Sequence, residues 1–210
     1  MPKRLLILAS GLVCLLCASA VYAATLTGTE GADDIIGSKN DDNINAKGGM
    51  DRVLGLDGDD RIRGGSGGDS IQGDGSCPPV SNPNLTDIGK CDQTRGSGAD
   101  NISGGDGVDV IGGLGGDDTI SGGNGNDNLA GGNGRDTIRG DSGNDTLSGL
   151  SGNDKITGGP GADKITGNAG RDTVLAADGT RDTINCGSGR DKLVADKSDK
   201  TAHCESVLRR

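Results

Sequence analysis

The chain has 210 residues and a formal net charge of −10 at neutral pH. Gly accounts for 42 residues, about three times the roughly 7% of an average protein, whereas hydrophobic residues make up only 30% and Phe and Trp are absent. The acidic balance argues against nucleic acid or an anionic membrane surface as a partner. So little apolar bulk argues against a conventional globular core.

Residues 1–23 have the features of a secretory signal peptide. A charged start is followed by an apolar run from Leu5 to Leu16 and by a small-residue cleavage site that ends at Ala23. A membrane-spanning helix is the alternative, but the run is shorter than the roughly 20 residues that such a helix needs. We therefore expect secretion, with no insertion into a membrane.

A nine-residue repeat fills most of the remaining chain. Four copies between Gly122 and Thr157 show it clearly: GGNGNDNLA, GGNGRDTIR, GDSGNDTLS and GLSGNDKIT. Each has Gly at the first and fourth places, Asp at the sixth and a large aliphatic residue at the eighth. Disordered acidic segments do not keep such a period, so we expect a folded repeat protein.

Sixteen copies of the repeat define the expected domain organisation. A first block of five spans residues 24–72, and an inserted loop without repeats occupies residues 73–94. A second block of eleven spans residues 95–194, with Ala176 as one extra residue. Residues 195–210 keep only a trace of the pattern and are expected to form a C-terminal cap.

The residues around the eighth place predict a short strand with one side chain facing inward. The glycine-rich residues before them suit a tight turn with positive φ angles. Two repeats then make one lap of 18 residues, and successive laps stack as parallel strands about 4.8 Å apart. The predicted fold is an all-β parallel solenoid, in which only the stack of laps makes a core.

The same stacking gathers the sixth-place aspartates into two columns, whose carboxylates would repel one another without counter-cations. Hard oxygen ligands on flexible loops suit Ca²⁺ better than Mg²⁺, and a single His gives no zinc site. We expect several Ca²⁺ ions, with folding linked to their binding and the calcium-free chain largely unfolded. The sixth place holds Asp33, Asp42, Asp51, Asp60, Asp69, Asp100, Asp109, Asp118, Asp127, Asp136, Asp145, Asp154, Asp163, Asp172, Asp182 and Asp191.

This pattern resembles the hemolysin-type, or RTX, calcium-binding nonapeptide GGxGxDxUx. The resemblance implies a parallel β-roll, in which each ion lies between a loop and the loop two repeats later and is bound by the sixth-place Asp and turn carbonyls. A glycine-rich solenoid without metal is the alternative. The predicted metal ligands are Asp33, Asp42, Asp51, Asp60, Asp69, Asp100, Asp109, Asp118, Asp127, Asp136, Asp145, Asp154, Asp163 and Asp172.

In two turns another residue stands in place of the fourth-place Gly. Asn40 tolerates a positive φ, so its turn is expected to survive. Thr180 is β-branched and unsuited to a positive φ, so its turn is predicted to bind no metal.

Four cysteines follow the leader, and they allow three pairings. We favour Cys77–Cys91, which would close the inserted loop, and Cys186–Cys204, which would tie the cap to the last laps. Metal-binding or free thiols are the alternative.

No catalytic motif accompanies the repeats, and the single histidine, His203, has no nucleophile motif around it. The sequence therefore predicts no enzyme. It predicts a secreted calcium-binding protein, free or associated with the cell surface, whose folding depends on extracellular Ca²⁺. The alternative is a calcium-dependent recognition or adhesion module for a polysaccharide or another surface. The oligomeric state is left open.

Overall fold

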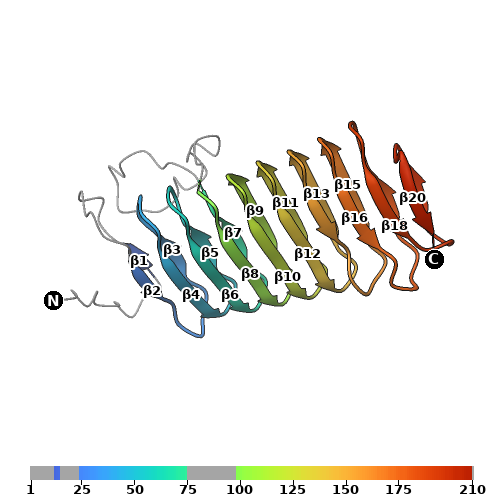
Figure 1. Ribbon diagram of the computed structural model, residues 1–210. Helices are drawn as coiled ribbons and strands as arrows, with labels where there is room; N and C mark the ends of the chain where they lie inside the picture. The colour runs from blue at the N-terminus through green and yellow to red at the C-terminus, as the bar shows by residue number, and fades with distance from the viewer. Residues whose placement is uncertain (1–11, 15–23, 75–97, 210) are drawn as a thin grey trace.

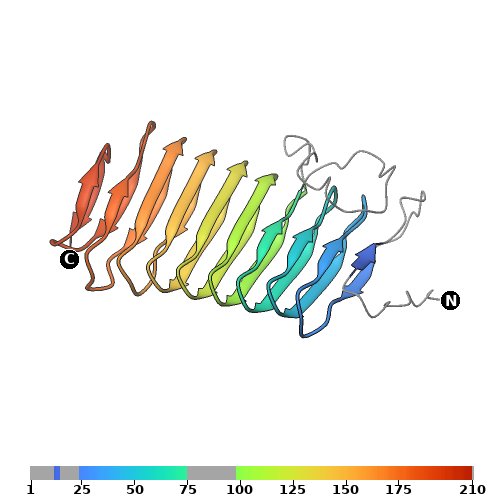
Figure 2. The same ribbon diagram turned by 180° about the vertical axis from the view of Figure 1, so that it is seen from behind.

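A computed structural model describes residues 12–14, 24–74 and 98–209. Its strands stack one behind another in two layers, from the N-terminal to the C-terminal end (Figures 1 and 2). The predicted all-β parallel solenoid with two repeats per lap is confirmed. The described residues contain no helix of the length and apolar character that crossing a membrane would require.

The strands form two parallel ten-stranded sheets, one from the odd-numbered and one from the even-numbered strands. The odd sheet contains β1 (Leu12–Cys14), β3 (Asp34–Ile36), β5 (Arg52–Leu54), β7 (Ser70–Gln72), β9 (Val110–Gly115), β11 (Asn128–Asn133), β13 (Thr146–Ser151), β15 (Lys164–Ala169), β17 (Thr183–Asn185) and β19 (Lys200–Ala202). The even sheet contains β2 (Thr25–Thr27), β4 (Asn43–Gly48), β6 (Arg61–Ser66), β8 (Asn101–Asp106), β10 (Thr119–Asn124), β12 (Thr137–Ser142), β14 (Lys155–Thr157), β16 (Thr173–Ala176), β18 (Lys192–Ala195) and β20 (Ser206–Arg209).

Each strand begins at the seventh place of a repeat, and the eighth-place side chain points into the core. In the even sheet, for example, Ile120 of β10 pairs with Ile138 of β12. All eighth-place aliphatics of the sixteen repeats are buried, so the core is two columns of aliphatic side chains. They are Ile35, Ile44, Val53, Ile62, Ile71, Ile102, Ile111, Ile120, Leu129, Ile138, Leu147, Ile156, Ile165, Val174, Ile184 and Leu193.

The stack continues without a break past the insertion. β6 pairs with β8 and β7 with β9, across the residues that separate the two repeat blocks. Gly73 and Asp74 belong to this stack, because the amide of Gly73 donates to Gly112 O at 2.9 Å and that of Asp74 to Gly113 O at 3.2 Å. The predicted Cys77–Cys91 pair lies outside the described residues.

Both ends of the chain extend the two sheets. Within the predicted leader, Leu12–Cys14 pairs in parallel with β3. In the C-terminal segment, β19 pairs with β17 and β20 with β18, so the cap is a further lap of the solenoid. The predicted Cys186–Cys204 disulfide is confirmed; it joins residues one lap apart, with Cα atoms 5.1 Å from each other.

The extra residue near the end lies in a turn. Ala176 is buried and pairs with Ala195 at the end of β16, so it occupies the first place of its repeat. Ala177 is exposed and lengthens the following turn. The assignment of Ala176 as the extra residue is therefore wrong, because a small first-place side chain fits the interior that Gly occupies elsewhere.

The fourth-place glycines lie directly over one another through the stack. Gly125 has a φ of 143°, and a Cβ there would overlap the carbonyl oxygen of Gly107 in the preceding lap. Gly143 and Gly152 are blocked in the same way. The second place is more permissive, since Leu114 occupies it with a φ of 81°. The turn therefore requires Gly at the fourth place for both conformation and space.

Two Gly→Ala substitutions test this requirement. We expect Gly125→Ala to destabilise the protein by at least about 2 kcal/mol, because it adds backbone strain and a clash. Gly112→Ala should leave stability unchanged or raise it by up to about 1 kcal/mol, since its Cβ would meet only Leu114 Cδ2 at 3.8 Å. Urea unfolding in calcium-containing buffer measures both. Equal effects of the two substitutions would contradict the explanation.

Candidate metal centre

The sixth-place aspartates lie in two columns, each directly before the strands of one sheet. All sixteen are at most 3% exposed. The odd column precedes odd strands and contains Asp33, Asp51, Asp69, Asp109, Asp127, Asp145, Asp163 and Asp182. The even column precedes even strands and contains Asp42, Asp60, Asp100, Asp118, Asp136, Asp154, Asp172 and Asp191. The structure thus brings every predicted ligand into one of two rows.

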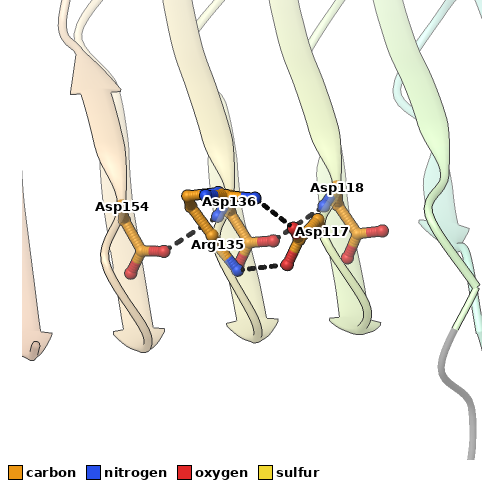
Figure 3. A network of polar contacts seen from close by, with 5 residues as sticks. All are labelled: Asp117, Asp118, Arg135, Asp136 and Asp154. Atoms are coloured by element: carbon orange, nitrogen blue, oxygen red, sulfur yellow. Dashed lines mark hydrogen bonds and ion pairs between the residues drawn. The ribbon is translucent and has the colours of Figure 1, made fainter.

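In every one of these aspartates except Asp33, one carboxylate oxygen accepts a backbone amide of the preceding lap. The amide of Asp118 donates to Asp136 Oδ1, and the amide of Asp136 donates to Asp154 Oδ1, each at 2.9 Å (Figure 3). The ladder also crosses the insertion, where the amide of Asp60 donates to Asp100 Oδ1 at 2.8 Å. The aspartates are therefore part of the framework that holds the laps together.

The other carboxylate oxygen, Oδ2, is buried in fourteen of these aspartates and accepts no hydrogen bond. A single orphaned buried polar atom costs roughly 1–3 kcal/mol, and more when charged. Because the same atom is orphaned at the same place in fourteen repeats, the feature belongs to the repeat itself. A cation is the partner that suits an ionised buried oxygen. The fourteen atoms belong to Asp51, Asp60, Asp69, Asp100, Asp109, Asp118, Asp127, Asp136, Asp145, Asp154, Asp163, Asp172, Asp182 and Asp191.

Burial opposes ionisation of these groups when no cation is bound. It raises the pKa of Asp60 and Asp100 to about 8, against the partial relief of one backbone hydrogen bond each. Burial raises the pKa of Asp118 and Asp163 to about 7, and neighbouring aspartates in the same column add to the effect. The columns therefore hold acids that would be partly protonated near neutral pH without a counter-charge.

The exposed fifth-place side chains show the opposite situation. Asp117 accepts the Arg135 amide at 2.8 Å and Arg135 Nη2 at 2.9 Å, so both of its oxygens have partners (Figure 3). These hydrogen bonds lower the pKa of Asp117. Of the two adjacent acids Asp117 and Asp118, only the buried Asp118 has a carboxylate oxygen without a partner.

The donor set fits calcium. Among the described residues, no three Asp, Glu, His or Cys side chains converge closely enough to hold an ion, so each ion would need backbone oxygens as well. Backbone carbonyls lie near the orphaned oxygens; a Cβ on the first-place Gly122 would overlap Asp127 Oδ2 and would lie 2.8 Å from Gly140 O. Carboxylate and carbonyl oxygens on adaptable turns match the six to eight oxygen ligands of Ca²⁺.

The first two turns are closed by their own side chains. Ser38 donates its amide to Asp42 Oδ2 at 2.5 Å and its hydroxyl to Asp42 Oδ1 at 3.1 Å. Asp42 also accepts the Ala24 amide at 2.6 Å, so both of its oxygens have partners. Thr29 closes the preceding turn onto Asp33 Oδ2 in the same way; Asp33 Oδ1 has no partner among the described residues.

The turns of Asn40 and Thr180 also differ from the repeat. Neither residue has a positive φ, so the Asn40 turn is kept without the glycine conformation that the prediction invoked. The hydroxyl of Ser38 takes over, accepting the Asn40 amide at 3.3 Å. At the other end, Asp178 accepts the Thr180 amide at 2.8 Å and the Gly161 amide at 3.1 Å. Side chains hold both turns.

Three acids of the columns lie outside the recognised repeats. Asp199 accepts the Asp182 amide at 3.0 Å, and Glu205 accepts the Asp191 amide at 2.9 Å, so they end the two ladders. Asp74 is buried beside the insertion. Asp199 and Glu205 each lie two residues before a core-side position of a strand, as the sixth-place Asp does. The turns before them are shorter than in the repeat, so a search for a nine-residue period does not find them.

A family model for the RTX calcium-binding nonapeptide repeat matches seven overlapping segments of the chain, which together span residues 22–76 and 96–181. The chain belongs to the RTX calcium-binding nonapeptide repeat family. Its repeats therefore imply calcium binding, and the predicted family is confirmed. Among curated proteins, none matches the chain.

The raised pKa values predict how the calcium-free RTX protein responds to pH. Unfolded aspartates titrate near 3.9, whereas Asp60 and Asp100 have a pKa of about 8 in the folded state. The folded state therefore binds more protons between these values, and its stability is lost as the pH rises toward 8. We expect far-UV circular dichroism in chelator to show more β-sheet signal at pH 5 than at pH 8.

Saturating Ca²⁺ should reverse this order, because protons compete with the cation for the same oxygens. The matching experiment is a thermal melt in CaCl₂, with higher stability expected at pH 8 than at pH 5. A calcium-free protein that is more stable at pH 8 would contradict the assignment of raised pKa values to the columns.

Proposed function

We propose that this RTX protein is a secreted calcium-binding protein that completes its fold when it meets extracellular Ca²⁺. The observation that carries the proposal is the fourteen buried Oδ2 atoms without a hydrogen-bond donor. Bound Ca²⁺ would supply the positive charge that these oxygens lack. The chain itself contributes the carboxylates, the glycine turns that bring carbonyls beside them, and the amide ladder that fixes their spacing.

We assign calcium to the turns whose aspartates have an orphaned Oδ2 and a repeat-like glycine turn. Asp33 and Asp42, which the motif also predicts as ligands, are left out because their turns are closed by hydroxyl and amide hydrogen bonds. The turn that contains Thr180 is left out because Asp178 closes it. The assigned residues are Asp51, Asp60, Asp69, Asp100, Asp109, Asp118, Asp127, Asp136, Asp145, Asp154, Asp163, Asp172 and Asp191.

The N-terminal end supports removal of the leader before Ala24. The Ala24 nitrogen lies 2.6 Å from Asp42 Oδ1, so cleavage at this point would place an ammonium group against the first carboxylate of the even column. That charge would do for Asp42 what a cation does for the later laps. Cleavage would also remove β1 from the edge of β3.

Extracellular calcium modules often bind in the range of about 10⁻⁴–10⁻³ M. A protein with sites in that range would bind few ions inside a cell and become loaded after export. The acid columns would thus keep the chain loosely folded until secretion and rigid afterwards.

A calcium titration tests this function. We expect the purified protein in chelator to show little β-sheet signal in far-UV circular dichroism, and addition of CaCl₂ to restore it cooperatively. MgCl₂ at equal concentration should have a much smaller effect, because Mg²⁺ demands octahedral geometry and retains its waters. Full β-sheet signal already present in chelator would refute the coupling of folding to calcium.

Two Asp→Asn substitutions in the even column test the assignment of sites. Asp136→Asn should lower the number of bound ions by at least one, while its β-sheet signal in chelator stays the same or rises, because a buried charge is lost. Asp42→Asn should leave the number of ions unchanged but lower stability in CaCl₂ by about 1–3 kcal/mol, since its amide would face the Ser38 and Ala24 donors.

Calcium-binding stoichiometry from calorimetry, urea unfolding in CaCl₂ and far-UV circular dichroism in chelator provide the readouts. If Asp42→Asn loses an ion, or if Asp136→Asn loses none, the division between ion-dependent and side-chain-closed turns is wrong.

A further inference from the structure

Asp74 is a buried acid at the second place of its turn, where the repeat motif has no acid. It occupies the second place of the turn from which the insertion leaves, after Gly73 and before Gly98 at the fourth place. Its side chain is 1% exposed and its Oδ2 accepts no hydrogen bond. Its other oxygen, Oδ1, accepts the Gly98 amide of the same turn at 3.3 Å, and the Gly115 amide of the neighbouring lap also hydrogen-bonds the carboxylate.

The second-place residues in the neighbouring laps of this column have a different backbone conformation. Leu56 and Leu114, in the laps before and after, have φ values of 85° and 81°. Asp74 has no positive φ, and its carboxylate turns into the column toward Gly98. The insertion thus changes the local backbone in a way that brings an additional acid inside.

The sixth-place acid of the same turn is Asp100. Its Oδ1 accepts the Asp60 amide at 2.8 Å, whereas its Oδ2 has no donor and lies against Gly73 Cα, where a Cβ would overlap it. No ion pair with Asp74 or Asp100 occurs among the described residues. This turn therefore holds two buried, unpartnered carboxylate oxygens, where the regular glycine turns hold one.

We propose that Asp74 and Asp100 together bind one Ca²⁺ ion, and that this is the tightest calcium site of the protein. The proposal rests on the calcium-binding function above and adds a ligand that the nonapeptide motif does not contain. Charge count is a main determinant of calcium affinity, so a second carboxylate strengthens the site. An ion there would also fix Asp74 and Gly98, the two described residues that border the insertion.

The test is a calcium titration of the full chain and its Asp74→Asn variant, with competition against a chromophoric chelator to obtain the stepwise dissociation constants. Asp74→Asn should weaken the tightest binding step at least 10-fold. Asp141→Asn is the matched control, because Asp141 also occupies a second place but is partly exposed and accepts the Ser121 hydroxyl. The control should bind its first ion within 2-fold of the unsubstituted chain.

A second readout locates the effect. Hydrogen exchange of the backbone segment 98–100 should become slow at lower Ca²⁺ concentration than that of segment 143–145, and Asp74→Asn should remove this difference. Equal far-UV spectra of all three proteins in saturating CaCl₂ would show that the variants fold.

The outcomes separate the two proposals. If the unsubstituted chain binds no calcium, the proposed function itself fails. If it binds calcium but Asp74→Asn leaves the tightest step unchanged, or weakens it no more than Asp141→Asn does, only the Asp74 site is refuted.

Discussion

The structure depends on a carboxylate that does two things at once. In every regular lap the sixth-place Asp accepts the amide of the preceding lap with one oxygen at 2.8–2.9 Å, while the other oxygen is buried without a donor. The first interaction requires the acid to be inside, and the second makes its charge unfavourable there. Laps therefore cannot be stacked without also stacking negative charge. A cation resolves this conflict without breaking the ladder.

The glycine positions determine in which turns a cation could neutralise the buried carboxylate. A fourth-place Gly is required because the next carbonyl lies where a Cβ would be, as at Gly125 and Gly152. Second-place glycines are also tightly packed, since a Cβ on Gly123 would overlap Gly105 O, yet Leu114 and Asp141 occupy this place with a positive φ. Residues other than Gly are therefore tolerated at the second place, whereas the regular turns keep Gly at the fourth place. The two turns that abandon the glycine conformation, at Asn40 and Thr180, replace it with hydroxyl and carboxylate hydrogen bonds.

The nine-residue period was enough to predict the solenoid, its two aliphatic columns and its two acid columns, since each follows from one place in the repeat. It could not predict features that depend on a particular neighbour. Ser38 and Thr29 close their turns because a hydroxyl happens to reach the Asp of the same turn. Asp199 and Glu205 continue the ladders only because shortened turns still align their acids with the laps before them.

The interactions that hold a turn depend on its position along the stack. Side-chain hydrogen bonds close the turns at the N-terminal end, and at the C-terminal end Asp178 and the Cys186–Cys204 disulfide hold the last laps. The orphaned Oδ2 atoms begin at Asp51 and continue through the stack to Asp182 and Asp191 in the last laps. Cross-links and hydrogen bonds that need no metal thus limit fraying, which starts at the ends of a repeat array where each lap has a single neighbour. In the function proposed above, calcium acts where a lap has neighbours on both sides, and its role is to neutralise the buried carboxylates in the interior of the stack.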